Sequence, residues 1–249
     1  MRKYELEKGM IRYLFDGEPE SQLGYNIIAL LQGKVALLID TGYENQAEEV
    51  LRDLDNNGFA IAGVIISHFH HDHIFGLKVL PKTQMYGSAE FQVTFDRYFK
   101  ADEQRCFAPT VLVKKRRRIV FGSHDIILIP FPGHSRCGIL TDINGRYLHI
   151  GDELLLTNDG RPVLPSVGRE DVKPHYEALG RLRKYFDRIF IPSHGRLVED
   201  RDIKEREVRN RQTYLQTVLQ HQEPIGFAEA VRDCDCVFLN DKWHFNIYK

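Results

Sequence analysis

The sequence predicts an α/β fold in which two similar βα units face each other across one site. Continuous apolar runs such as "ALLID", "VIIS" and "IFIP" are typical of strands that are covered on both faces, so we expect the sheets to lie beneath helices. These runs alternate with segments of helical periodicity. The order of strand, glycine turn, strand, aspartate, helix and strand also occurs twice, which indicates two related units.

The first unit begins with "YNIIALLQGKVALLIDTG", in which two apolar runs flank a turn at Gly33. This pattern predicts a β-hairpin whose second strand ends at Asp40. The segment "NQAEEVLRDLDNNG" has apolar residues at helical spacing, and it predicts a helix capped by Asn45 and ended by Gly58. "AGVIISH" then predicts a buried strand that ends at His68.

The second unit follows the same order. "GILTDINGRYLHIGD" predicts a second hairpin, and Asp152 follows Gly145 by seven residues, just as Asp40 follows Gly33 by seven. "VKPHYEALGRLRKYF" has the apolar spacing of a helix, and "RIFIPSH" predicts a strand that ends at His194. We therefore expect the two aspartates and the two histidines to occupy corresponding positions.

The chain of 249 residues, with 43% hydrophobic and 28% charged residues, is long enough for a large core, and we expect one elaborated domain rather than two. Residues 1–199 should form this domain, and residues 200–249 a helical extension packed on it. The extension begins with the charged helical pattern "DRDIKEREVRNRQTYLQTVLQHQ". Its apolar positions are Ile203, Tyr214, Leu215, Val218 and Leu219.

The charge balance gives no reason to expect a nucleic-acid or membrane partner, because 34 Lys and Arg residues face 35 Asp and Glu residues and the net charge is −1. Neither a signal peptide nor a membrane span is apparent, so we expect a cytoplasmic protein. The four cysteines are scattered, which predicts reduced thiols. A metal site at "CDC", Cys234 to Cys236, is the less favoured alternative.

The basic run "KKRRR", Lys114 to Arg118, lies between the apolar segments "VLV" and "IVF". It allows two interpretations, an RNA-binding patch or a solvated edge or hairpin of a sheet. We favour the second, because no interleaved aromatic and glycine-rich nucleic-acid motif lies beside it. The aromatic residues Phe69, Phe75, Tyr98, Phe99 and Tyr176 could line a pocket or belong to the core, and we favour the core.

A candidate metal site follows from the residue types that occur where strands should end. The stretch "SHFHHDH" places four of the chain's eleven histidines within residues 68–73, and His134, Asp152 and His194 follow other strands. Strand ends are where α/β sheets place their sites. Imidazole and carboxylate suit zinc, iron, manganese and cobalt, and the absence of cysteine disfavours a closed structural zinc site. These side chains exceed the ligands of one tetrahedral ion, so they favour two divalent ions that share a carboxylate.

These motifs resemble those of the metallo-β-lactamase fold superfamily. "HFHHDH" matches its H-x-H-x-D-H signature, and later motifs match in order over about residues 20–196. The resemblance implies a four-layer αβ/βα sandwich. It also implies that Asp152 bridges two metal ions, with His71 as a non-ligand and Asp40 supporting the histidine loop. The other implied ligands are His68, His70 and His134 for the first ion, and Asp72, His73 and His194 for the second.

The activity implied by the resemblance is metal-dependent hydrolysis, in which a metal-bridging hydroxide cleaves a small ester, thioester, lactone or phosphodiester, as in the glyoxalase II and lactonase branches. Asp72 would orient that hydroxide. Zinc is the expected metal, with iron and manganese as alternatives. Two other readings stay open: a mononuclear iron persulfide dioxygenase, and a nuclease or noncatalytic metal-binding member of the fold. The sequence does not identify the substrate or the oligomeric state.

Overall fold

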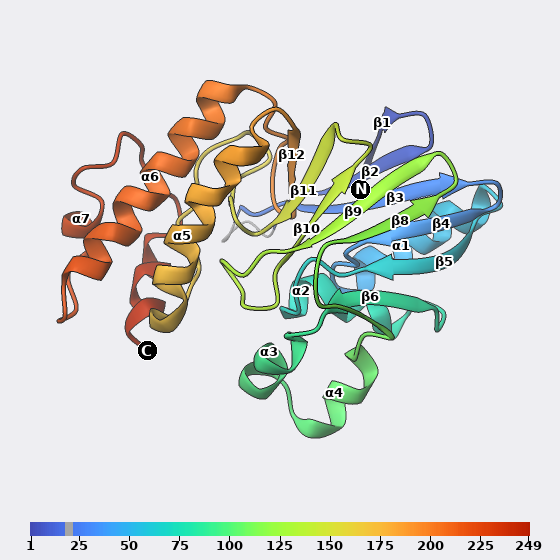
Figure 1. The fold of residues 1–249 in the computed structure, drawn as a ribbon, viewed down its shortest axis with the longest axis horizontal. Coiled ribbons are helices and arrows are strands. Elements are labelled where there is room, and N and C mark those ends of the chain that lie inside the picture. The colour runs from blue at the N-terminus through green and yellow to red at the C-terminus, as the bar shows by residue number, and fades with distance from the viewer. Residues whose placement is uncertain (18–21) are drawn as a thin grey trace.

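The computed structural model of the chain describes residues 1–17 and 22–249, and its strands form two stacked sheets (Figure 1). The first sheet has seven strands in the order of the chain. Its strands are β1 (Arg2–Glu7), β2 (Met10–Phe15), β3 (Tyr25–Gln32), β4 (Val35–Ile39), β5 (Ala60–Ile65), β6 (Gln84–Ser88) and β7 (Val111–Val113). Strands β1 to β4 pair antiparallel, and β4 to β7 pair parallel.

The second sheet has five strands in the order β12-β11-β10-β9-β8. Its strands are β8 (Arg117–Phe121), β9 (His124–Pro130), β10 (Ile139–Ile143), β11 (Tyr147–Gly151) and β12 (Ile189–Pro192). The pair β11 and β12 is parallel, and the other neighbours are antiparallel. Each unit thus consists of a hairpin followed by a helix and a parallel strand, which confirms the duplication expected from the sequence.

Four layers result because each sheet is apolar on both faces. In β3, Ile27 packs in one cluster with Val50 of the helix α1 (Glu44–Asn56), whereas its neighbour Ile28 packs in another with Ile126 of the second sheet. Successive side chains of a strand point to opposite faces, so one strand contacts both layers. The α/β class and the αβ/βα layering are confirmed.

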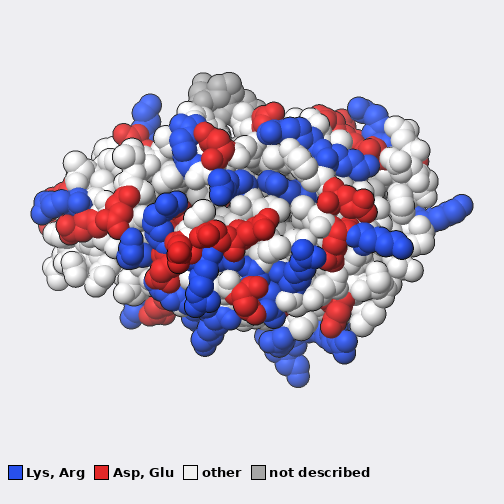
Figure 2. Space-filling model, turned by 90° about the horizontal axis from the view of Figure 1, so that it is seen from above, with Lys and Arg blue, Asp and Glu red and all other residues white. Residues whose placement is uncertain are grey.

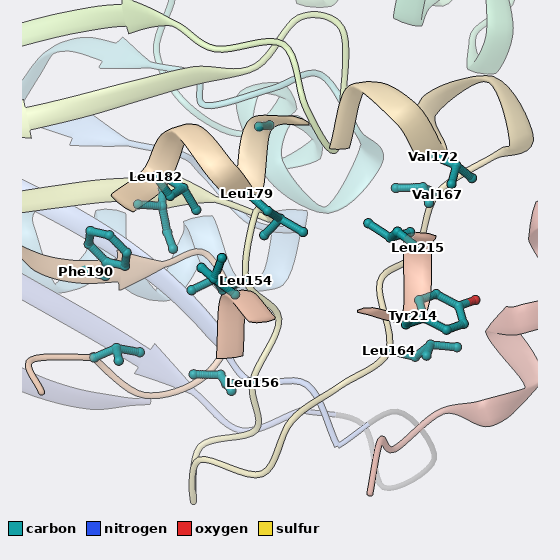
Figure 3. Close-up of a cluster of buried hydrophobic side chains, with 14 of the residues drawn as sticks. Leu154, Leu156, Leu164, Val167, Val172, Leu179, Leu182, Phe190, Tyr214 and Leu215 are labelled. Atoms are coloured by element: carbon teal, nitrogen blue, oxygen red, sulfur yellow. The ribbon is translucent and has the colours of Figure 1, made fainter. Parts of the chain in front are cut away.

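Helices α5 (Val172–Leu182) and α6 (Arg201–Gln220) cover the outer face of the second sheet (Figure 1). Figure 3 shows the apolar cluster in which these helices and the sheet meet. The remaining helices are α2 (His71–Ile74), α3 (Phe91–Tyr98), α4 (Ala101–Phe107), α7 (Phe227–Ala230), and the 3₁₀ helices η1 (Phe75–Lys78), η2 (Arg169–Asp171), η3 (Arg183–Tyr185) and η4 (Asp241–Tyr248). Within the described residues, no helix is both long and apolar enough to cross a membrane.

Two details of the helices differ from the expectation. Helix α1 begins at Glu44, so Asn45 lies inside it, and the backbone N–H of Tyr43 donates to the side chain of Gln46 at 3.0 Å. Leu219 of α6 is 36% exposed, whereas Arg211 is fully buried on the packed face. Amphipathic spacing therefore located α6 and most of its packed face, since Tyr214, Leu215 and Val218 are fully buried, but it did not reveal the polar side chains that are buried there in hydrogen bonds. The predicted boundary at residues 199 and 200 stays a prediction.

The basic run Lys114 to Arg118 is exposed and connects two edge strands, β7 of the first sheet and β8 of the second. The edge or hairpin interpretation agrees with this position, because Arg117 and Arg118 lie on the edge strand β8, which forms an antiparallel hairpin with β9. Figure 2 shows acidic and basic side chains interspersed over one face of the molecule, with no extended area of one sign on that face.

Candidate metal centre

The histidine loop leaves the carboxyl end of β5, and its alternating side chains face opposite ways. Phe69 is fully buried in the cluster beneath the first sheet's helices, whereas His68 and His70 face the centre. The chain then turns through α2, which adds Asp72 and His73. Gly76 allows this turn to pack closely, because a Cβ there would lie 2.5 Å from the carbonyl oxygen of Thr41.

Three ring nitrogens converge in the three-histidine group, which consists of His68, His70 and His134. Nδ1 of His70 lies 3.0 Å from Nε2 of His68 and 3.2 Å from Nε2 of His134. Burial lowers the pKa of His70 to about 4 and the pKa values of His68 and His134 well below the ordinary histidine value. Neutral imidazoles with converging nitrogens are the protonation state that a metal ion requires.

The spacing fits a tetrahedral zinc ion. Zinc to nitrogen bonds of about 2.0 to 2.1 Å place two ligand nitrogens about 3.3 to 3.4 Å apart, close to the distances in the three-histidine group. His134 lies on the loop between β9 and β10, and Glu153 Oε1 accepts a hydrogen bond from its backbone N–H at 3.1 Å. The geometry and protonation of this group therefore fit a first metal ion.

A mixed group lies beside it and consists of Asp72, His73, Asp152 and His194. Nε2 of His194 lies 3.2 Å from Oδ2 of Asp72 and 3.5 Å from Oδ1 of Asp152. Nε2 of His73 lies 3.6 Å from Oδ1 of Asp72 and 3.5 Å from Oδ2 of Asp152. Two imidazoles and two carboxylates are a donor set that suits zinc, iron or manganese.

Asp152 borders both groups. Its Oδ2 atom, 3.5 Å from His73 in the mixed group, also lies 3.8 Å from Nε2 of His68 and 3.7 Å from Nε2 of His134. Within the described residues, Oδ1 of Asp152 and Nε2 of His73 are buried without a hydrogen-bond partner. Buried polar atoms are nearly always paired, so these atoms fit metal coordination.

Protonation differs between the two groups. Burial would lower the pKa of His194, but the carboxylates of Asp152 and Asp72 raise it to about 10. The same carboxylates, together with Asp40, raise the pKa of His73 well above its ordinary value against the effect of burial. Burial would raise the pKa of Asp72, but the charge of His73 holds it below the ordinary aspartate value. Without metal the mixed group is therefore a network of ion pairs.

The carboxylate of Asp40 holds the histidine loop in place through hydrogen bonds. It accepts hydrogen bonds from the backbone N–H and hydroxyl of Ser67, both at 2.7 Å, and from the hydroxyl of Ser193 at 3.1 Å. It also lies 2.9 Å from Nδ1 of His73, which leaves Nε2 of His73 facing the mixed group. Nδ1 of His194 lies 2.9 Å from the carbonyl oxygen of Gly24, which likewise directs its Nε2 to the centre.

His71 belongs to neither group. Its ring lies 4.7 Å from the ring of Phe75 and 4.6 Å from that of Phe99, so it packs among aromatic side chains. The cysteines at positions 234 and 236 are free, and the candidate metal groups found among the described residues do not include them.

A cavity of about 550 Å³ opens above both groups. Tyr98 lines it with its ring 5.2 Å from that of His70, so its interpretation as core is wrong: it is 43% exposed. Three further aromatic residues line the cavity and were not identified from the sequence: Tyr25, Tyr43 and Trp243. Tyr43 directly follows Asp40, Thr41 and Gly42 at the end of the first predicted hairpin, and this position could have identified it as a cavity residue. Nothing near Trp243 in the sequence relates it to a metal site.

The model of the metallo-beta-lactamase superfamily matches residues 22–194 of the chain. This protein belongs to the metallo-beta-lactamase superfamily. Metallo-beta-lactamase domain-containing protein 1 of Xenopus laevis is 26% identical over 197 residues, which cover 74% of this chain and 77% of that relative. Membership was therefore correctly inferred from the histidine signature and the later motifs.

Solved structures of the superfamily share the fold. A metallo-beta-lactamase from Pontibacter korlensis superimposes with a TM-score of 0.70 at 16% identity, covering 86% of this chain and 98% of that one. A stereoselective inverting sec-alkylsulfatase from Pseudomonas sp. has a TM-score of 0.67 at 14% identity and covers 97% of this chain and 47% of that one. At this identity the likeness shows the fold alone, and the glyoxalase II-like or lactonase-like branch stays a prediction.

Proposed function

We propose that this superfamily member is a metal-dependent hydrolase that cleaves a small ester, thioester, lactone or phosphodiester. The observation that carries the proposal is the position of Asp152 between two ligand groups at the base of one cavity. A cavity of about 550 Å³ suits a small molecule rather than a polymer. The two groups would hold two divalent ions, zinc in the first instance, which would supply hydroxide at neutral pH and polarise the oxygen of the scissile group.

The protein's own residues bind and orient the reactants. Asp72 lines the cavity and its side chain is 23% exposed, in contrast to the buried His73 and His194. Because the pKa of Asp72 is lowered, it stays a carboxylate and accepts a hydrogen bond, which suits it to orient a water molecule rather than to take up a proton.

The test is a substrate panel combined with metal analysis. Protein loaded with zinc, manganese or iron is assayed on an ester, a thioester, a lactone and a phosphodiester, and bound metal is counted by mass spectrometry. We expect two ions per chain, hydrolysis of at least one class, and loss of activity on chelation that zinc or manganese restores. Asp152→Ala should lower both metal content and activity, the latter by at least about 100-fold.

Asp159→Ala is the matched control, because that carboxylate is 63% exposed and lies outside both groups. It should leave metal content and activity unchanged. Full activity of rigorously metal-free protein would contradict the proposal. One iron per chain with oxygen consumption on a persulfide would instead identify a dioxygenase, and metal binding without turnover on any of these substrates a noncatalytic member.

A further inference from the structure

The 3₁₀ helix η4 presents one of its faces to the metal cavity. Trp243, Asn246 and Lys249 all line the cavity, and they recur at intervals of three residues. A 3₁₀ helix has three residues per turn, so this spacing places them in one row. The next residue of each turn faces the core, where His244 and Ile247 are at most 1% exposed.

The face of η4 that lines the cavity forms one of its walls, and hydrogen bonds on the core side of the helix hold this wall in place. Nδ1 of His244 lies 3.0 Å from the hydroxyl of Tyr214 in α6, and its Nε2 lies 2.7 Å from the carbonyl oxygen of Ile225. The chain before η4 is also fixed, because the backbone N–H of Leu239 donates to the carbonyl oxygen of Pro162 at 3.0 Å. Trp243 is therefore part of a rigid wall, which a specific subsite requires.

Trp243 continues an apolar surface that starts at the metal centre. It packs against a cluster formed by Leu23, Leu155 and Val163. Leu155 follows Asp152 by three residues and lines the cavity together with Leu23, Val167 and Trp243. A molecule bound at the metal groups thus meets apolar side chains on this wall, while Asn246 of η4 and Lys249, directly after it, add polar groups.

We propose that Trp243, Leu23, Leu155 and Val167 form a subsite for an apolar substituent of the substrate. The inference rests on the proposed hydrolase and narrows its substrate class to carboxylic esters, thioesters or lactones that carry an alkyl chain or ring beside the scissile carbonyl. Trp243 is the specificity-determining residue. Phosphodiesters of polar molecules do not use such a wall, because burying polar groups against it costs hydrogen bonds.

The chain's single tryptophan provides a direct binding assay. Linear carboxylates from acetate to octanoate are titrated into the zinc-loaded protein while the emission of Trp243 is recorded. We expect saturable shifts whose half-saturating concentration falls about twofold to fourfold for each methylene group. Two ester series, one varied in the acyl chain and one in the alcohol, should show the same increments in kcat/KM in at least one series.

Variants test whether the chain-length dependence comes from the subsite or from a general change in the protein. Trp243→Ala should flatten the chain-length dependence, measured by calorimetry, to less than about 1.5-fold per methylene group, while Trp243→Phe retains most of it. Phe245→Ala is the matched control, because that ring lies on the third face of η4 and is 60% exposed. It should keep the wild-type dependence. Circular dichroism checks that each variant is folded.

The experiments distinguish a failure of the subsite proposal from a failure of the hydrolase proposal. Hydrolysis without chain-length dependence in either ester series, together with unchanged Trp243 emission, would overturn the subsite and leave the hydrolase. Saturable binding of octanoate without turnover of any panel substrate would contradict the proposed hydrolase activity but support the subsite. Preferential cleavage of phosphodiesters would also overturn the subsite, as would equal chain-length dependence in Trp243→Ala and the wild type.

Discussion

The seven side chains of the candidate metal centre differ in whether they carry protons that a metal ion must displace. The three-histidine group is neutral at physiological pH, because burial lowers the pKa of each ring. In the mixed group, the carboxylates of Asp72 and Asp152 keep His73 and His194 protonated, since both histidines have raised pKa values. An ion can therefore enter the first group without displacing protons, whereas the second group must release them.

This difference predicts two zinc-binding steps with different pH dependence. With a histidine pKa of about 10, the neutral fraction of His194 rises tenfold with each pH unit up to that value, so affinity at the mixed group should rise at least about tenfold per unit between pH 6 and 8. The three-histidine group should change little over this range, because the pKa of His70 is about 4. Calorimetry in buffers of different ionisation enthalpy measures both the affinities and the protons released.

The exposed His221, which is 40% accessible, allows a control variant, His221→Gln, that should preserve both steps. Equal proton release in the two steps, or a second step that does not depend on pH, would contradict the assigned protonation.

At the scale of elements, α6 determines the position of one cavity wall. The guanidinium of Arg211 is fully buried and donates to the carbonyl oxygens of Leu155 and Val163, as well as to the carboxylate of Glu207 at 2.7 Å. These hydrogen bonds fix the chain that follows Asp152, including the cavity residue Leu155. A buried guanidinium of this kind holds backbone carbonyls that would otherwise lack partners.

Arg211→Ala should therefore destabilise the protein by about 3 to 5 kcal/mol, because the buried carboxylate of Glu207 would keep only the more exposed Arg206, at 3.3 Å, as an ion-pair partner. Arg209→Ala on the same helix removes an arginine that is 54% exposed, and should cost no more than about 1 kcal/mol. Urea unfolding followed by circular dichroism compares the two. Similar small losses in both variants would show that Arg211 does not hold the wall.

At the scale of the whole molecule, the metal centre lies between the two βα units. His68, His70, Asp72 and His73 follow β5 of the first sheet, whereas the other three candidate ligands follow β9, β11 and β12 of the second. Asp40 also links the halves, since Ser67 and Ser193 both donate to it. Because the ligands come from both sheets, bound ions would connect the two layers and stabilise the stacked arrangement.

Zinc should accordingly raise the thermal unfolding temperature. At a free zinc concentration about 1,000-fold above Kd, binding stabilises the folded state by about 4 kcal/mol, which corresponds to roughly 8 to 16 °C for a chain of this size. Differential scanning fluorimetry with and without chelator measures the shift. Asp152→Ala should lose most of it, and His71→Gln should keep it because His71 lies outside both groups. If zinc raised the unfolding temperature of Asp152→Ala as much as that of the wild type, Asp152 would not be a metal ligand.

Much of the fold and of the ligand arrangement could be predicted, because the relevant signals are local. A buried strand reads as an apolar run, and a polar residue that follows it within one or two positions lies at the strand's end, as Asp40, Asp152 and His194 do. The boundary of α1 was displaced because its first turn uses Gln46 rather than the predicted cap at Asn45. In α6, apolar spacing correctly predicted the buried Tyr214, Leu215 and Val218 but not the buried Arg211, because periodicity does not reveal burial in hydrogen bonds.

The sequence by itself determined the superfamily, the duplicated α/β units and the residue types of a metal centre, since each is written in a short stretch of chain. Only the tertiary structure decided which nitrogens converge, which histidines hold protons and which side chains enclose the cavity. Trp243 follows Asp152 by ninety-one residues, yet both line the same cavity. Contacts of this kind depend on how sheets and helices stack, and stacking is set by the packing of the whole core.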